Sequence, residues 1–175
     1  MSLQAVRTVP GKLEREKRFL AAHAASHDRI YRYFRRRTDG AGTAEDLCSE
    51  VFRIAWEKLA TGGDLSVMVL FGVAKNVLRN HERSAVRSAN LIGALRAERW
   101  PEAPNHDSPV REALERLSPD EREVLLLTYW DGFTSKEISD LLNTSATAVR
   151  MRLHRARKAL SHLIHAQPQA EGAEL

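Results

Sequence analysis

The chain has 175 residues, which is enough for one ordinary domain or two small ones. Its hydrophobic share of 43%, charged share of 29% and net charge of +4 are typical of a globular protein, and its mildly basic surface is compatible with an anionic partner. The single cysteine, Cys48, excludes an internal disulfide and fits a reducing compartment. No apolar run matches a signal-peptide core or a membrane span, so the composition predicts a cytoplasmic protein without membrane insertion.

The first part of the chain carries helical patterns between glycine breaks. Residues 1–15 are polar and basic, and we expect them to form a flexible arm. From Glu16 apolar residues recur at helical spacing as far as a break at 39–42. Thr43 and Asp46 then have the spacing of a capping box, which predicts the start of a second helix.

A third helix is predicted from Leu65 to about Arg83, and its first half is apolar nearly all round, as in a helix buried inside a bundle. A short further helix is expected over 90–99, and the three prolines between 100 and 109 predict a flexible linker. In the second half of the third helix and just beyond it, basic residues recur every four positions and so share one ridge: Lys75, Arg79, Arg83 and Arg87.

A second domain is expected over 110–165, followed by a tail at 166–175. Ser118, a proline after it and Glu121 form a complete helix start, and Gly132 is the expected stop of that helix. Because no strand signal appears, the predicted class is all-α, with two small helical domains joined by a flexible linker.

The segment 134–160 has the layout of a helix-turn-helix. Thr134 is placed to cap the first helix, Asn143 stands at the tight turn where the backbone is left-handed, and the second helix starts at Ala146. Five basic residues and no acidic one lie between 143 and 170. The C-terminal domain is therefore predicted to be a helix-turn-helix of the winged-helix-like four-helix type.

The outer face of this second helix supplies the expected DNA contacts. Small residues at its start would let the helix enter the major groove, Arg150 can donate two hydrogen bonds to a guanine, and basic residues further along would meet phosphates. The alternative is a basic amphipathic helix packed in a bundle, with solvated arginines. The expected contacts are Ser145, Ala146, Thr147, Arg150, Met151, His154, Arg155, Arg157 and Lys158.

Three stretches carry a resemblance to a known family. The stretch 114–157, which ends in Leu-His-Arg-Ala-Arg, is similar to the fourth conserved region of bacterial sigma factors of the extracytoplasmic-function type. The stretches 43–52 and 70–81 resemble the second conserved region of the same family, which docks on the clamp helices of RNA polymerase and recognises the −10 element. The departures from the family pattern are Val69 for the usual Trp, Asn143 for Gly and Ala148 for Thr.

The resemblance implies a sigma factor that directs RNA polymerase core to promoters, aids their opening and catalyses no reaction. The domain 16–99 would grip the polymerase clamp and the −10 strand, while the domain 110–165 would read the −35 duplex and contact the polymerase flap. An anti-sigma factor remains open as a further partner. The resemblance places polymerase docking at Asp46, Glu50, Arg53 and Trp56. It places −10 binding at Lys75, Asn76, Arg79, Asn80, His81 and Arg83.

A stand-alone regulator and a nucleic-acid enzyme are the two alternative functions. A stand-alone helix-turn-helix regulator would leave the similarity of 43–52 and 70–81 unexplained, and a nucleic-acid enzyme would need a nucleophile or metal cluster that 1–100 lacks. His23 and His27 have the i, i+4 spacing of a metal pair, but no further ligand has matching spacing, so no metal and no cofactor is expected. Cys48 is expected to be a small buried apolar residue.

Overall fold

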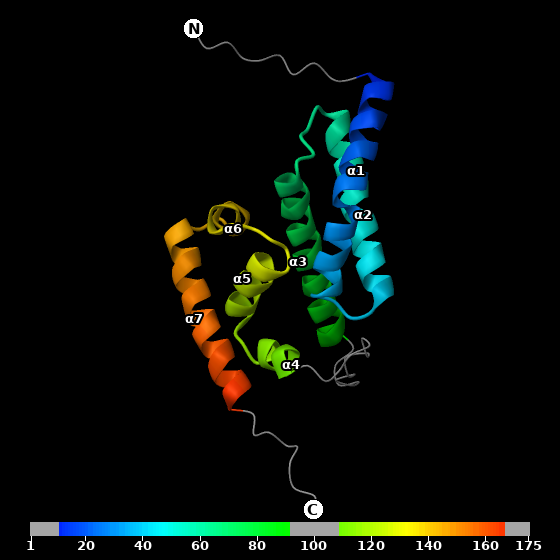
Figure 1. Cartoon of the computed structure of the whole chain (residues 1–175). Helices are drawn as coiled ribbons and strands as arrows, with labels where there is room; N and C mark the ends of the chain where they lie inside the picture. Colours follow the sequence, from blue (N-terminus) through cyan, green and yellow to red (C-terminus); the bar gives the residue numbers. More distant parts are fainter. Residues whose placement is uncertain (1–10, 92–108, 167–175) are drawn as a thin grey trace, which may run out of the picture. The chain divides into compact units, whose positions relative to one another are not determined.

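The computed structural model describes residues 11–91 and 109–166, and within these ranges every regular element is an α-helix (Figure 1). The chain divides into two compact units, the first ending at Glu102 and the second starting at Ala103. The predicted all-α class with two helical domains is confirmed. The predicted arm up to residue 10, the linker over 100–108 and most of the tail lie outside the described residues. None of the described helices is long and apolar enough to cross a membrane.

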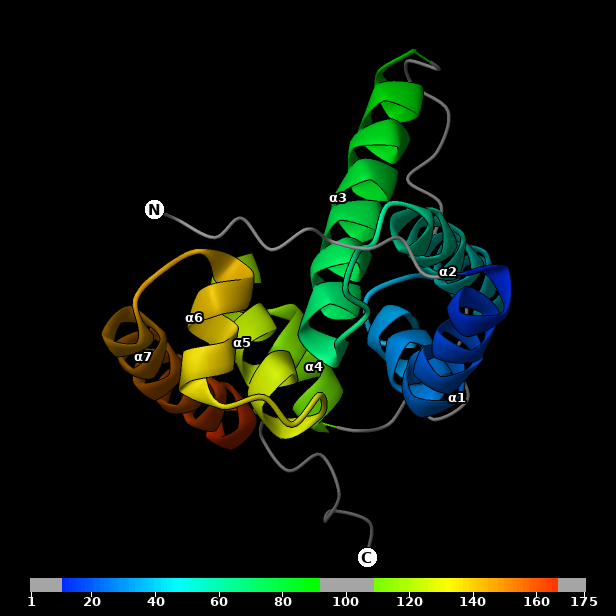
Figure 2. The same cartoon turned by 90° about the horizontal axis from the view of Figure 1, so that it is seen from above.

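Over residues 11–91 the first unit consists of three helices that all contact one another. α1 and α2 run side by side in opposite directions, and the first half of α3 packs against both (Figures 1 and 2). The core between them is made by Ile30, Tyr33, Phe34, Val51, Leu59, Leu70 and Phe71. The three helices are α1 (Lys12–Arg35), α2 (Ala41–Ala60) and α3 (Val67–Leu91).

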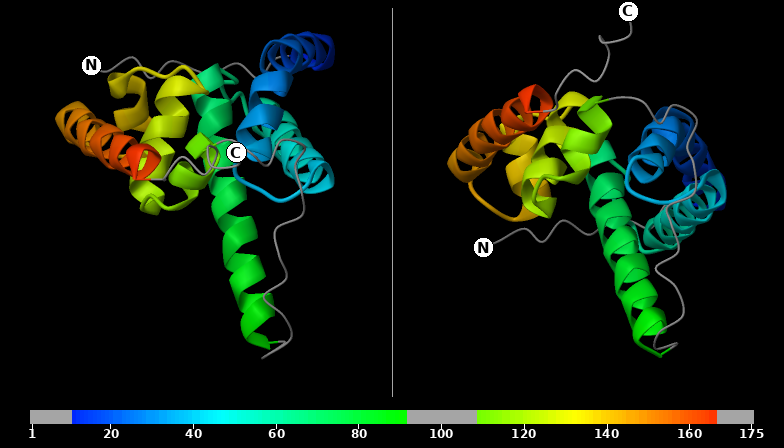
Figure 3. Two further views of the ribbon diagram at one scale, coloured as in Figure 1. Left: turned by 60° about the horizontal axis from the view of Figure 1, so that its bottom comes forward. Right: turned by 90° about the horizontal axis from the view of Figure 1, so that it is seen from below.

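The second half of α3 extends beyond the other two helices of its unit (Figure 3). Every side chain from Arg79 to Ser88 is exposed, whereas Leu70, Phe71 and Ala74 in the first half are fully buried. The helix therefore joins a packed half to a solvated half.

Two predicted helix boundaries in this unit are wrong. α1 begins at Lys12 rather than near Glu16, because nothing after Gly11 opposes a helix and Glu14 lies favourably in its first turn. α2 begins at Ala41 rather than at a Thr43 cap. Its N-cap is Gly40, whose φ of 81° turns the chain into the helix without a side-chain hydrogen bond.

The bounds predicted for α3 also need correction. The helix starts at Val67, after Ser66, whose hydroxyl accepts a hydrogen bond from the Val69 N–H at 3.4 Å. It continues past Arg83 to Leu91, because no glycine or proline interrupts 73–91. Residues 90 and 91, where a further short helix was expected to begin, are the end of α3 instead, and the remainder of that expected helix, 92–99, lies outside the described residues.

In the second unit, α7 is the central element. It contacts each of the other three helices, and the unit buries Val124, Leu125, Leu127, Ile138, Val149, Leu153 and Ala156 between them (Figures 1 and 2). Pro109, expected at the end of the linker, is the first residue of a helix instead, a position that its fixed φ favours. The helices are α4 (Pro109–Glu115), α5 (Pro119–Tyr129), α6 (Ser135–Leu142) and α7 (Ala146–His165).

The caps predicted for α5 are present. The Ser118 hydroxyl accepts the Glu121 N–H and the Glu121 carboxylate accepts the Ser118 N–H, which is a complete capping box. The helix ends at Tyr129, and Gly132, with φ 74°, makes the left-handed turn that leads out of it. This turn aims the chain toward α6.

Candidate nucleic-acid and protein interfaces

The helix-turn-helix is built from α6, a short turn and α7. Thr134 caps α6 through a second capping box with Glu137, in which the two residues exchange side-chain-to-backbone hydrogen bonds of 2.8 and 3.3 Å. Asn143 has φ 52° and ψ 55°, the left-handed conformation predicted for it. Ser145 then caps α7 by accepting the Ala148 N–H at 3.0 Å. Local hydrogen bonds therefore fix where each helix of the motif begins.

The outer face of α7 is polar and exposed at its N-terminal half. Thr147, Arg150, Met151 and His154 are all exposed, Met151 to 63%, and Ala146 is half-buried. The Arg150 guanidinium donates a 3.1 Å hydrogen bond to the Thr147 hydroxyl one turn earlier, which directs it along the exposed face. The helix buries its opposite side through Val149, Leu153 and Ala156.

The remaining basic residues of α7 differ in their surroundings. Arg155 and Lys158 are exposed, and among the described residues neither has a side-chain partner. Arg152 forms a 3.4 Å ion pair with Asp120 at the start of α5. Arg157 donates a 2.6 Å hydrogen bond to the Tyr129 hydroxyl at the end of α5.

The predicted −10 residues lie along α3. Asn76, Arg79, Asn80, His81 and Arg83 are exposed, and Lys75 is half-buried. The Arg79 guanidinium donates a 2.7 Å hydrogen bond to the Asn76 side-chain oxygen, one turn back. The structure therefore places these residues on a single helix, Lys75 and Asn76 in its packed half and the other four in its solvated half.

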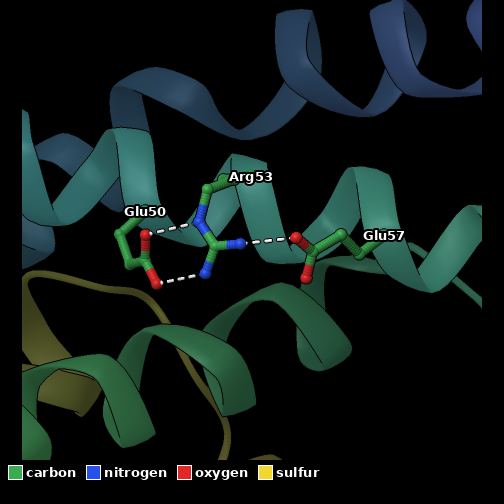
Figure 4. Close-up of polar contacts among 3 residues, drawn as sticks. All are labelled: Glu50, Arg53 and Glu57. Carbon is green, nitrogen blue, oxygen red and sulfur yellow. Dashed lines mark hydrogen bonds and ion pairs between the residues drawn. The ribbon is translucent and has the colours of Figure 1, made fainter.

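The predicted docking residues Asp46, Glu50 and Arg53 lie on the outward side of α2. The Arg53 guanidinium donates hydrogen bonds to two carboxylates (Figure 4). Glu50 accepts two of them, at 2.6 and 2.7 Å, and Glu57 accepts a third. The hydrogen bond from Arg53 lowers the pKa of Glu50. Asp46, by contrast, is exposed and has no side-chain partner among the described residues. We call Asp46, Glu50, Arg53 and Glu57 the acidic stripe. Its three acids and one base give it a net charge of −2.

Beside the acidic stripe lies a groove between α1 and α2 that the sequence did not reveal. Its volume is about 680 Å³. Trp56, the fourth predicted docking residue, forms one wall; its ring lies 5.3 Å from that of Phe19 and 4.7 Å from the Arg15 guanidinium. The spacing of Phe19, His23 and His27 on one side of α1 was the signal that could have found it. The lining residues are Glu16, Phe19, Leu20, His23, His27, Ser49, Phe52, Arg53 and Trp56.

The rings of His23 and His27 contact each other in this groove, with centroids 4.8 Å apart and planes tilted by 34°, and the centroid of the His23 ring also lies 4.5 Å from that of Phe52. Burial, and then the neighbouring His27, lower the pKa of His23 below its ordinary 6.5. No set of three metal-ligating side chains occurs in residues 11–91 or 109–166. Close by, Cys48 is buried as predicted, and its burial raises the thiol pKa to about 11.

Comparison with known proteins places this geometry in a family. Residues 108–160, which include all or most of each helix in the second unit, match the model of "Sigma-70, region 4". Two relatives are ECF RNA polymerase sigma factors that are each 31% identical to this chain. SigL of Mycobacterium tuberculosis aligns over 75% of this chain and 80% of its own length, and SigM of Bacillus subtilis over 77% and 87%.

A third relative is longer. BldN of Streptomyces coelicolor, also an ECF RNA polymerase sigma factor, is 29% identical over 78% of this chain, which spans 56% of BldN. Among solved structures, the fold is similar to the sigma factor RpoE in its complex with the anti-sigma factor NepR from Bartonella quintana (TM-score 0.65, 21% identity, 88% of this chain and 98% of that one). It is also similar to CnrH in complex with the cytosolic domain of CnrY (TM-score 0.63, 23% identity, 85% and 88%).

These similarities concern the chain and its fold, and the roles of single residues stay predictions. The identity to SigL and SigM extends across most of both chains, and the region 4 match falls on the capped helix-turn-helix. The chain therefore belongs to the extracytoplasmic-function sigma factors, the transcription initiation factors that direct RNA polymerase to promoters.

Proposed function

We propose that the two units of this sigma factor divide promoter recognition, the second reading the −35 duplex and the first docking on polymerase and holding the −10 strand, without any reaction catalysed by this chain. One observation carries the proposal: a helix-turn-helix whose two helices both begin at a side-chain cap presents an acid-free, exposed face on α7. The bond-forming chemistry would belong to the polymerase. The place of action would be the cytoplasm.

For the −35 duplex, the proposed reading head is the N-terminal half of α7. Thr147 and Met151 are exposed and Ala146 is small, so the helix can approach base edges closely. Arg150 would donate to a guanine, and the side chains further along the helix would neutralise phosphates. The other side of this unit would contact the polymerase flap.

For polymerase docking, two features of α2 support a single surface. The acidic stripe is complementary to a basic partner, and the adjacent groove offers aromatic walls at Phe19, Phe52 and Trp56 to an apolar side chain. Interfaces of this kind combine buried aromatic anchors with charged rims. The proposed partner is the clamp helices of the polymerase.

For the −10 element, the proposed contact is the stretch of α3 from Lys75 to Arg83. Side chains of Arg79 and Arg83 lie one helical turn apart there, where they can follow a nucleic-acid backbone, and the amides of Asn76 and Asn80 offer hydrogen bonds to unpaired bases. Extruding a base from the duplex costs a few kcal/mol, which such contacts would offset.

An anti-sigma factor is a further proposed partner. Both similar structures are sigma factors held by an anti-sigma factor or by the cytosolic domain of CnrY. A protein that covers the acidic stripe and the groove would block docking on polymerase. It would thereby keep the sigma factor inactive.

The test is transcription by the host's core polymerase from a pool of host genomic fragments, with and without this protein. The expected result is a new set of transcripts whose start sites share upstream −10 and −35 elements. A gel-shift titration on those fragments accompanies it, because a sigma factor should bind them poorly alone and tightly with core enzyme. Unchanged transcripts, together with nanomolar sequence-specific binding by the free chain, would instead establish a stand-alone regulator.

A further inference from the structure

Two arginines of α7 bind side chains of α5, one a carboxylate and the other a neutral hydroxyl. At the start of α5, the Asp120 carboxylate pairs with Arg152 at 3.4 Å. At its end, the Tyr129 hydroxyl accepts a 2.6 Å hydrogen bond from Arg157 Nε, and the guanidinium carbon lies 5.5 Å from the centre of the tyrosine ring. α5 and α7 lie side by side along this stretch (Figures 1 and 2).

The two contacts leave the arginines in different electrostatic states. A carboxylate offsets the charge of Arg152, whereas the phenol oxygen of Tyr129 is a neutral acceptor. The contact with Tyr129 therefore does not offset the positive charge of Arg157. Its fork has five N–H donors, of which the Nε–H alone is used by Tyr129, so the two terminal nitrogens stay available for a second acceptor. Such a fork fits carboxylate and phosphate oxygens, and DNA presents phosphate.

The position of Arg157 on α7 suits a phosphate at the edge of the major groove. Arg150 and Arg157 are seven residues apart, which in an α-helix puts them about 20° apart around the axis and about 10.5 Å apart along it. The major groove is about 12 Å wide. If Arg150 contacts base edges, Arg157 on the same side of the helix comes to the rim of the groove, where the sugar-phosphate backbone runs.

We propose that Tyr129 is a positioning residue that holds the Arg157 guanidinium in place for a DNA phosphate. The inference rests on the proposed −35 binding by α7 and adds a role for α5 to it. Tyr129 is 55% exposed, so its hydrogen bond contributes little to folding. Its effect is to order a flexible side chain before DNA arrives, which is worth about two- to tenfold in affinity.

The test is a double-mutant cycle on the full chain, with the wild type, Tyr129→Phe, Arg157→Ala and the double variant. Binding to a 20-base-pair duplex of random sequence is followed by fluorescence anisotropy over a range of salt concentrations. Random sequence suffices because phosphate contacts do not depend on base identity. Trp130→Phe, a change at the exposed aromatic neighbour of Tyr129, is the matched control and should bind like the wild type.

Arg157→Ala should weaken binding about tenfold and reduce the salt slope by about one, as expected for one lost phosphate contact. Tyr129→Phe should weaken binding about threefold with an unchanged slope, and it should have no further effect once Arg157 is gone. A merely structural tyrosine would lower affinity equally in both backgrounds, and that result would overturn the proposal.

The outcome separates this inference from the proposed function. If Arg157→Ala binds like the wild type while the chain still directs transcription from specific promoters, the positioning role is wrong and the sigma function stands. If the chain does not alter transcription by core polymerase at all, the proposed function itself fails.

Discussion

Replacing Asp46 by Lys is the sharpest perturbation of the proposed docking surface. Asp46 lies on the acidic stripe, is exposed and has no side-chain partner among the described residues, so the change should affect folding by no more than about 0.5 kcal/mol. An exposed ion pair contributes about 0.2–1 kcal/mol. The new lysine adds a repulsion of similar size against a basic partner. The sum, about 0.4–2 kcal/mol, corresponds to roughly two- to thirtyfold weaker binding.

Glu50 is a less clean target. Its carboxylate holds Arg53 by two hydrogen bonds, so reversing its charge would also release Arg53 and leave Glu57 as its only partner there (Figure 4). The double variant of Asp46 and Glu50 should bind more weakly than Asp46→Lys alone. Only the single variant reports one charge without rearranging its neighbours.

The measurement is the affinity of labelled protein for core RNA polymerase at about 0.1 M salt, with helix content checked by circular dichroism. Asp28→Lys is the matched control, since it changes the net charge equally on the exposed side of α1 and breaks only the exposed ion pair with Arg32. The control should bind like the wild type. If Asp46→Lys and Asp28→Lys bind core enzyme equally well, the assignment of docking to the acidic stripe is refuted.

Three further predictions concern other parts of the chain. Arg150→Ala should relax base preference at one −35 position by about 1–3 kcal/mol, whereas Lys158→Ala should weaken binding to all sequences alike; identical behaviour in a binding-site selection would contradict the recognition face. Because the pKa of His23 is lowered by burial, the unfolded chain binds more protons than the folded one just below pH 6.5. The melting temperature should therefore fall as the pH is lowered from 7.5 to 5.5, and His23→Gln should reduce this fall. An equal fall in the variant would contradict the assignment of the effect to His23. With its pKa raised to about 11, Cys48 should react with a thiol reagent at pH 8 only in denaturant, and rapid labelling of the native protein would disprove its burial.

The helix-turn-helix was predictable in detail because its signals are local. The Thr134–Glu137 box, the left-handed Asn143 and the Ser145 cap each involve residues within a few positions of one another, so their spacing alone specifies the backbone. The prediction of where α2 starts was wrong because no local side-chain signal marks that position. A glycine at Gly40 can begin a helix without any side-chain signal, so the Thr43 pattern that resembled a cap was misleading.

The proposed docking surface was less predictable because it depends on how helices pack. Asp46, Glu50, Arg53 and Trp56 were placed on α2 by resemblance, yet the groove needs α1 against α2, a contact between residues far apart in the sequence. The ion pairs of Arg53 with Glu50 and Glu57, by contrast, are local. Its two partners lie three and four residues away, the spacing at which helical side chains meet, and this pairing turns a free cation into part of an acidic surface.

The overall net charge of +4 conceals the arrangement that matters for binding in the first unit. The acidic stripe concentrates negative charge on α2, while the exposed half of α3 carries Arg79, Arg83 and Arg87 at four-residue spacing. The net charge is thus negative on α2, despite Arg53 and Lys58, and positive on the exposed half of α3, despite Glu82. A polyanion is attracted to α3 and repelled by the acidic stripe, and a basic protein surface shows the reverse preference. We expect this difference in net charge to orient the unit between DNA and polymerase before any base or apolar contact forms, and salt should weaken both attractions together.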